Sequence, residues 1–205
     1  MNKKHKIIIV VVLMLALITT GYFCYKKVQE DKIGLISFEN IKKEIINGEI
    51  NIENEKVGLS FSFPDDWQIV NDDIGLSINS PNFISINDRV FIPQKGCRIS
   101  VSVEGQKDDN TEYSDLKYMI EDENYVNSKN ADKIKYEIIE LSGLKGVKNQ
   151  FFMANVFNNQ GDVIAIYVPY DNKIYYFEVD LFGEDRDVCL QEFNNFLSTV
   201  FIKKK

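Results

Sequence analysis

The sequence predicts an α+β fold, built mainly on antiparallel β-strands and preceded by one transmembrane helix. Three observations lead to this prediction. An apolar run without acidic or basic residues fills positions 7–24. From residue 57 onward, short segments alternate apolar and polar residues, as half-buried strands do, and turn residues separate them. Near the C-terminus, apolar residues recur every three or four positions, which is the period of an amphipathic helix.

The N-terminal run is the strongest signal in the chain. Residues 1–6 form a basic tip, and residues 7–24 follow as IIIVVVLMLALITTGYFC. As a helix this segment would span roughly 27 Å, close to the hydrocarbon thickness of a bilayer. An uncleaved transmembrane anchor fits that length best.

Two alternatives stay open for the same segment. A cleaved signal peptide needs small residues just before the cut, and Thr19 and Gly21 supply them. A lipid anchor at Cys24 is disfavoured, because the bulky pair Tyr22 and Phe23 precedes the cysteine where a lipoprotein has small residues.

Charge around the run favours an N-terminus in the cytoplasm. Three lysines precede the run and two follow it, so the bias is small. Long domains translocate largely regardless of their own charge. We therefore expect a single-pass protein of the cell membrane with its domain on the extracytoplasmic side.

The rest of the chain divides into a stalk and one domain. Residues 25–56 are predicted to form the stalk, with a short helix suggested by Phe38, Ile41 and Ile45, and residues 57–205 form the domain. Beyond residue 27 the chain has 19 basic against 31 acidic residues, a formal charge of −12. This balance argues against nucleic acid or anionic lipid as the main partner of the domain.

The predicted strands follow from alternation and from turn residues between them. Pro64 and Asp65 start the first turn, since proline presets φ and aspartate accepts local hydrogen bonds. The segments Asn158 to Gly161 and Tyr170 to Asn172 are predicted to close two hairpins. The predicted strands lie near residues 57–63, 67–70, 75–79, 83–86, 89–93, 97–104, 133–141, 148–157, 162–169, 173–181 and 199–202.

Two helices are predicted within the domain. The first begins at Asn110 or Thr111, where an N-cap residue is followed by acidic residues that suit a helix start. The second runs from about residue 185 to Leu197, and its buried stripe includes Phe193 and Phe196.

Two cysteines belong to the domain, and both are predicted to face its core. Cys97 begins the apolar positions of one strand, and Cys189 shares a helical face with Phe193. Free cysteine often occupies a core as a small hydrophobic residue. An oxidising exterior would also permit a disulfide between the two, so both states stay open.

Three short motifs give the chain a resemblance to a known family. They are GLSFSFPDDWQIV at 58–70, GLKG at 143–146 and FNNFLSTVFI at 193–202. With their order of elements, they resemble the PsbP-like family from residue 57 to the end. The resemblance implies an antiparallel sheet flanked by helices on both faces, an α/β/α sandwich. It also implies a binding or assembly module, and it transfers no metal-binding residue to this chain.

The domain lacks the side chains of common catalytic sites. The chain's one histidine is His5 in the basic tip, which excludes a Ser-His-Asp triad and histidine-based zinc ligation in the domain. No glycine-rich phosphate loop and no CxxC motif occurs. We therefore predict no catalytic, cofactor-binding or metal-binding residue and no cofactor.

Paired carboxylates are the remaining candidates for chemistry. Each pair falls in a predicted turn or helix start, where acidic residues bond the backbone, and none has the spacing of an EF-hand loop for calcium. The pairs are Asp65-Asp66, Asp72-Asp73, Asp108-Asp109 and Glu184-Asp185 with Asp187.

Aromatic residues are the candidates for partner contacts. Tyr170 and Tyr176 lie on the last hairpin, and Tyr176 is core if helices cover both faces but lines a binding patch otherwise. Trp67 follows the Pro64 turn, where its ring either covers one end of the core or stacks on a ligand.

These observations favour a membrane-anchored extracytoplasmic binding or assembly module without catalytic activity. Its expected partner is a protein at the membrane, whose identity the sequence does not give. The alternatives are a hydrolase that uses the turn carboxylates, or a carrier for a small ligand or calcium.

Overall fold

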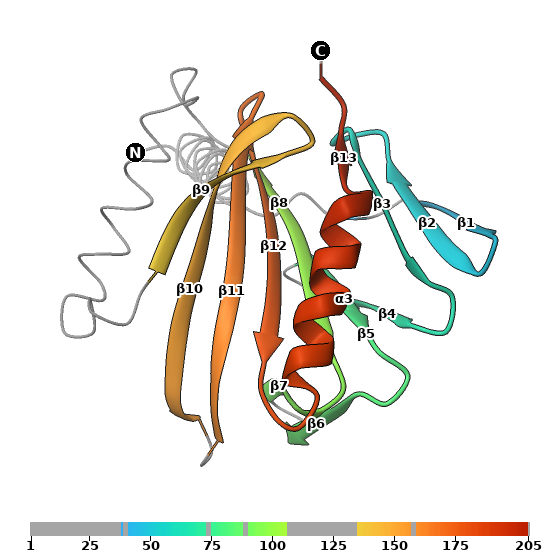
Figure 1. Cartoon of the computed structure of the whole chain (residues 1–205). Helices are drawn as coiled ribbons and strands as arrows, with labels where there is room; N and C mark the ends of the chain where they lie inside the picture. The colour runs from blue at the N-terminus through green and yellow to red at the C-terminus, as the bar shows by residue number, and fades with distance from the viewer. Residues whose placement is uncertain are drawn as a thin grey trace, which may run out of the picture. The chain divides into compact units, whose positions relative to one another are not determined.

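The computed structural model describes residues 38, 41–72, 75–87, 90–105, 135–156 and 159–204. The chain divides into two units, Met1–Gly34 and Leu35–Lys205, and every described residue belongs to the second. Strands make up most of the described residues (Figure 1). Its elements are β1 (Lys42–Ile46), β2 (Glu49–Asn54), β3 (Leu59–Pro64), β4 (Gln68–Asp72), β5 (Gly75–Asn79), β6 (Ile84–Asn87), β7 (Val90–Lys95), β8 (Arg98–Gly105), β9 (Lys135–Leu141), β10 (Leu144–Val156), β11 (Asn159–Tyr170), β12 (Lys173–Leu181), α3 (Arg186–Thr199) and β13 (Phe201–Ile202).

The described strands form three antiparallel sheets. The largest has seven strands in the order β4-β5-β8-β12-β11-β10-β9. A four-stranded sheet has the order β1-β2-β3-β13, and β6 pairs with β7 in a separate ribbon. Because β8 pairs with both β5 and β12, it lies inside the large sheet although the chain enters it from the β6–β7 ribbon.

The core lies where one face of the seven-stranded sheet meets α3 and the four-stranded sheet. The helix presents Phe193 and Phe196 to this space, and they are 0% and 3% exposed. The ring of Phe196 lies 5.3 Å from that of Phe61 in β3 and 6.1 Å from that of Phe177 in β12. The apolar stripe of α3 therefore joins both sheets.

Two polar contacts reinforce this packing. The hydroxyl of Thr199, at the end of α3, accepts a hydrogen bond of 2.9 Å from the Ser62 amide and lies 3.0 Å from the Ser62 carbonyl. The buried hydroxyl of Tyr175 in β12 donates a bond of 2.6 Å to the Val57 carbonyl. Burial raises the pKa of Tyr175 to about 12, so the hydroxyl keeps the proton that this bond needs.

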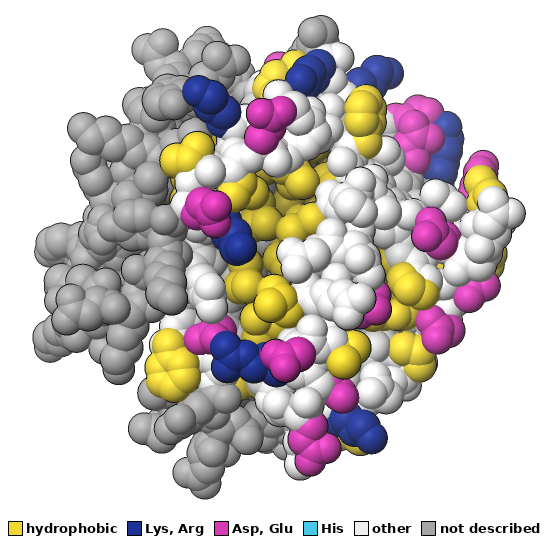
Figure 2. Space-filling model, in the orientation of Figure 1, with side chains coloured by type: hydrophobic (Ala, Val, Ile, Leu, Met, Phe, Trp, Pro, Cys, Tyr) yellow, Lys and Arg dark blue, Asp and Glu magenta, His cyan; other side chains and the backbone are white. Residues whose placement is uncertain are grey.

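The face that carries α3 remains partly open beside the helix. Figure 2 shows hydrophobic side chains gathered in a hollow at its centre, with charged side chains around the rim. Ile139, Leu144 and Leu197 are half-buried and pack against the core.

The predicted flanking of the sheet by helices on both faces is wrong. The described residues contain a single helix, α3, and the four-stranded sheet packs beside it on the same side of the core. No helix among the described residues is long and apolar enough to cross a membrane. The predicted anchor at 7–24 and the predicted helix from residue 110 lie outside the described residues.

The short helix predicted in the stalk is also wrong. Lys42–Ile46 is strand β1, and it forms a hairpin with β2. Asn47 and Gly48 form the connecting turn with φ values of 55° and 81°. An Asn-Gly pair favours this turn because both positions adopt positive φ at low cost.

Cys97 and Cys189 form a disulfide, with Cα atoms 5.2 Å apart. Cys97 precedes β8 and Cys189 lies in the first turns of α3, so the bond attaches the helix to the large sheet. Both residues are buried, as the core-facing prediction requires, and the bond is one of the two states that the sequence left open.

Reduction of this disulfide is expected to destabilise the protein by about 2–5 kcal/mol, because the bond links residues 92 apart in sequence. Urea unfolding with and without a phosphine reductant measures the loss. The count of reactive thiols should rise by two on reduction in denaturant. An unchanged urea midpoint after complete reduction would contradict the expectation.

Candidate functional site

The second face of the seven-stranded sheet, opposite α3, is polar at its centre. Alternate residues of β8 and β12, such as Val101 and Phe177, point into the core, so the residues between them point to the other face. In this register Ser100 lies opposite Glu178 and Ser102 opposite Tyr176. A central sheet position usually carries apolar side chains, so these polar groups call for a physical explanation.

Arg98 organises one end of this polar group. Its Nε and Nη2 atoms donate to the Ser77 hydroxyl at 3.3 and 3.1 Å. Its Nη1 lies 3.7 Å from the Asp180 carboxylate, and the two side chains are only 16% and 11% exposed. The attraction between Arg98 and Asp180 offsets part of the free energy that removing both charges from water costs.

Glu178 and Tyr176 form the other end. The Tyr176 hydroxyl donates a hydrogen bond to the Glu178 carboxylate. The Tyr176 ring lies 5.0 Å from that of Tyr167 on the neighbouring strand β11, which holds it in position. Tyr176, a predicted partner contact, is therefore part of the polar group.

Burial changes the acidity of these residues. Burial first, and the charge of Glu178 second, raise the pKa of Asp180 to about 7, against the lowering effect of Arg98. Burial also raises the pKa of Glu178, against its hydrogen bond from Tyr176 and the charge of Arg98. Burial raises the pKa of Tyr176 as well. The carboxyl groups of Glu178 and Asp180 thus share the single guanidinium of Arg98. A proton on one of the two carboxyl groups offsets part of the excess negative charge.

A pocket of about 240 Å³ opens among these side chains. We call it the polar pocket. Its described lining residues are Gly75, Leu76, Arg98, Ser100, Val101, Ser102, Tyr176 and Glu178.

Two buried amides share a face with the polar pocket and have unpaired polar atoms in the part of the chain that the structure describes. These atoms are Asn79 Oδ1 and both polar side-chain atoms of Asn149, and Asn149 is 0% exposed. Asn79 lies opposite Arg98, and Asn149 lies opposite Ala165, which in turn is opposite Glu178. Unpaired buried amides are rare and mark places where a further polar group can bind.

The side chains of the polar pocket can hold a polar group by hydrogen bonds. The described residues include no histidine, and no group of three or more His, Cys, Asp or Glu among them could hold a metal ion. The polar pocket offers a cation, a carboxyl, a phenol and hydroxyls in fixed positions. Such a set can donate and accept hydrogen bonds to a polar group.

The paired carboxylates predicted from the sequence do not assemble into one site in the part of the chain described. Asp65 and Asp66 are exposed in the turn after β3, and Asp185 and Asp187 lie at the start of α3. Asp73, Asp108 and Asp109 lie outside the described residues. Tyr170, the other predicted partner contact, is half-buried against the core.

Sequence analysis missed Arg98, Glu178 and Asp180. Each alternates with core residues, as solvent-facing residues of a strand also do, so alternation alone cannot separate the two cases. The opposite charges of Arg98 in β8 and Asp180 in β12 do point to a polar group. This complementarity can be recognised only once the pairing of the two strands is known.

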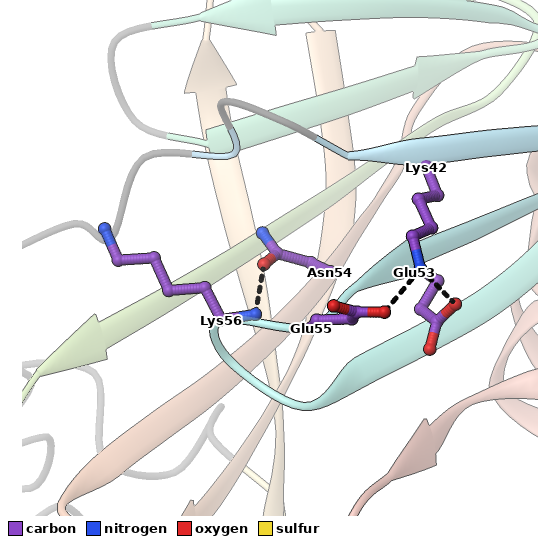
Figure 3. A network of polar contacts seen from close by, with 5 residues as sticks. All are labelled: Lys42, Glu53, Asn54, Glu55 and Lys56. Atoms are coloured by element: carbon purple, nitrogen blue, oxygen red, sulfur yellow. Dashed lines mark hydrogen bonds and ion pairs between the residues drawn. The ribbon is translucent and has the colours of Figure 1, made fainter.

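A second group of charges lies near the β2–β3 turn and is less suited to a site. Lys42 pairs with Glu55 and lies 4.0 Å from Glu53, while Asn54 accepts a 3.1 Å hydrogen bond from the Lys56 amide (Figure 3). The Lys42, Glu53 and Glu55 side chains are more than half exposed. Exposed ion pairs of this kind contribute little to stability and are screened by salt.

Two solved structures show which fold this is. The solution structure of cyanobacterial PsbP (CyanoP) from Synechocystis sp. PCC 6803 is 15% identical and covers 78% of this chain and 95% of its own, with a TM-score of 0.51. The crystal structure of LpqN, involved in cell envelope biogenesis of Mycobacterium tuberculosis, is 12% identical and covers 81% of this chain and 93% of its own, also with a TM-score of 0.51. The fold is therefore PsbP-like, as the sequence motifs suggested.

Searches by sequence add nothing to this assignment, since no protein-family model and no curated protein matches the chain. At these low identities the likeness to the two structures concerns the fold alone.

Asp180 is expected to make stability depend on pH. Its pKa is about 7 in the folded protein against 3.8 as the reference for the unfolded chain, so the folded state binds more protons between these values. The contribution is fully present below pH 4 and is lost as pH rises through 7. We expect the free energy of unfolding to fall by a few kcal/mol, on the order of 1.4 per pKa unit, between about pH 4 and 8.

Asp180→Asn should remove most of this slope, as measured by urea unfolding from pH 5 to 8. Asp65→Asn, in the exposed turn, is the matched control and should keep the wild-type slope. The same pH dependence in wild type and Asp180→Asn would show that Asp180 does not cause it.

Proposed function

We propose that this chain is a non-catalytic binding module that works on the outer side of the cell membrane, where the apolar segment 7–24 attaches it. The observation that carries the binding function is the polar pocket, a preformed set of donors and acceptors on an otherwise packed sheet. A partner protein at the membrane that presents a polar group would meet Arg98, Glu178 and the serine hydroxyls together.

The fixed positions of the buried carboxyl groups support a binding role. Glu178 accepts a hydrogen bond from Tyr176, and Asp180 faces Arg98, so each carboxyl group is held beside a partner. Donors and acceptors held in this way suit recognition of a polar group. The hydrolase alternative relied on turn carboxylates, of which Asp65 and Asp66 are exposed.

Two observations support an extracytoplasmic location. Disulfides persist in oxidising compartments and are rare in the cytosol, and Cys97 and Cys189 form one. The uncharged segment 7–24 has the length to enter a bilayer. The involvement of LpqN in cell envelope biogenesis is compatible with such a location for a domain of this fold.

The polar pocket is tested by neutralising one of its charges. Tagged full-length protein is isolated from native membranes, and the proteins that accompany it are quantified by mass spectrometry. We expect Glu178→Gln to lose the specific partner, because the change removes the charge while keeping the volume and an acceptor for Tyr176. Recovery should fall at least roughly tenfold, which corresponds to about 1.4 kcal/mol of binding.

The matched control is Glu104→Gln, which lies on the same face of β8, is exposed, and does not line the polar pocket. It should retain the partner. Partners that both variants retain equally would sink the assignment of the pocket. A substrate turnover that Glu178→Gln abolishes would show an enzyme instead of a binding module.

The proposed location of the domain is tested separately, by protease digestion. Protease added to intact spheroplasts should digest residues 28–205, while full-length protein should sediment with membranes before digestion. Protection of the domain until lysis would place it inside the cell, and a soluble form beginning near Tyr22 would establish a cleaved signal peptide.

A further inference from the structure

The polar pocket keeps hydrogen-bonding capacity that the described residues leave unused. Ser102 lines the pocket, and its hydroxyl makes no hydrogen bond among the described residues, although Ser102 is only 6% exposed. A polar side chain that is more than nine-tenths buried ordinarily has a partner. Ser102 therefore points to a polar group that enters the pocket from outside.

Four polar side chains surround the place that such a group would occupy. Ser100 and Ser102 come from β8, Tyr176 and Glu178 come from β12, and all four line the pocket. Side chains that lie opposite one another on paired strands start about 5 Å apart, and those two residues apart on one strand start about 7 Å apart. A small group above the centre of this square can therefore contact oxygen atoms from both strands at once.

The unused capacity of the square consists mainly of acceptors. The Tyr176 hydroxyl donates its proton to the Glu178 carboxylate, and this is the one hydrogen bond to Glu178 among the described residues. A carboxylate has lone pairs for several further donors, and each serine oxygen also accepts. A ligand that fits this set is one that donates several hydrogen bonds.

The charges at the pocket favour a positive ligand over a negative one. Arg98 donates to the Ser77 hydroxyl through two of its nitrogens, and the third lies 3.7 Å from Asp180. An anion would have to compete with these partners for the guanidinium, and it would add to the negative charge of Glu178 and Asp180. A cation beside Glu178 balances the second carboxyl group and leaves the pairing of Arg98 intact.

The ligand set suits an ammonium group better than a metal ion. Glu178 is the one carboxylate among the lining residues that the structure describes, whereas calcium and magnesium prefer a shell of oxygen ligands with several carboxylates. An ammonium group has a single charge, three N–H donors and no acceptor. It matches one carboxylate flanked by serine hydroxyls.

We propose, resting on the binding function stated above, that the polar pocket recognises a primary ammonium group, such as a lysine side chain of the partner polypeptide. The nitrogen donates to the Glu178 carboxylate and to the hydroxyls of Ser100 and Ser102. The acidic excess of the chain beyond residue 27 favours the approach of such a ligand.

A titration of full-length protein in detergent micelles, followed by ligand-observed NMR, tests the class of ligand. The main probe is lysine capped as the N-acetyl methylamide. Capped norleucine has the same stem without the charge, and capped trimethyllysine keeps the charge without N–H donors. Capped glutamine and capped glutamate supply a neutral amide and an anion. We expect saturable binding of capped lysine and no saturable binding of the other four probes.

Ser102→Ala tests the geometry while it leaves every charge in place. We expect a roughly tenfold weaker affinity for capped lysine, as for the loss of one hydrogen bond to a charged group. The folded state should survive, because the hydroxyl has no partner to lose among the described residues. Trp67 is buried in the core and does not line the pocket, so its fluorescence follows a thermal melt that checks this. Ser60→Ala, at a half-buried serine of β3 outside the pocket, is the matched control and should bind capped lysine as the wild type does.

The free amine n-butylamine distinguishes the source of the ligand. Tighter binding of capped lysine than of n-butylamine points to a polypeptide, and binding of n-butylamine alone points to a small amine; both results support recognition of an ammonium group. Equal binding of capped norleucine or trimethyllysine, an unchanged affinity in Ser102→Ala, or no saturable signal with either amine would overturn the proposal.

Failure of this proposal is distinguishable from failure of the binding function. If capped glutamine or glutamate binds instead and Glu178→Gln abolishes that binding, the pocket is a binding site for another class of ligand. If no amine binds while Glu178→Gln still loses the membrane partner, the ammonium assignment is wrong and the binding function stands. If no probe binds and Glu178→Gln keeps the partner, both are wrong.

Discussion

The attachment of α3 at both of its ends is the constraint on which the rest of the domain depends. At its start, the disulfide joins Cys189 to Cys97 before β8. At its end, Thr199 bonds the backbone of Ser62 in β3. Between these points Phe193 and Phe196 fill the space between the two sheets. The helix therefore sets the distance between the two sheets.

On the polar face of the large sheet, in contrast to the core around α3, burial of the side chains costs free energy. Burying Arg98, Glu178 and Asp180 carries a desolvation cost that their mutual attraction repays only in part. Apolar residues of similar volume would give a sheet of equal or greater stability. The raised pKa values of Glu178 and Asp180 are physical signs of that cost, as is the amide of Asn149, which has no hydrogen-bond partner among the described residues. A binding role gives these costly groups a use, which stability alone does not.

Most strands of the domain could be predicted from the sequence, because alternation is strong wherever one face is buried. Leu59, Phe61 and Phe63 in β3, and Tyr175, Phe177 and Val179 in β12, are buried as the pattern requires. The helix α3 was equally predictable from its stripe. The hairpin of β1 and β2 was missed because β1 is exposed on both faces, so packing imposes no alternation on it. Its Phe38, Ile41 and Ile45 spacing fits a helical period by chance, and the Asn47-Gly48 turn was the better signal.

The sites depend on contacts between distant parts of the chain, which local patterns do not specify. Asp180 follows Arg98 by more than eighty positions, and only the pairing of β8 with β12 makes them neighbours. Two cysteines that face the core can likewise be free thiols or form a disulfide. Only the fold shows whether their Cα atoms lie close enough for the bond. Charged residues in a strand are ordinarily solvent-facing, so burial of Glu178 could not be inferred from its position in the alternation.

The disulfide connects the fold to the location that we propose for the protein. Cys97 and Cys189 are both buried, so the bond attaches the start of α3 to the large sheet from within the core. Disulfides persist in oxidising compartments and are rare in the cytosol. A reducing compartment would remove this covalent attachment of α3, so the domain is expected to be most stable in an oxidising one.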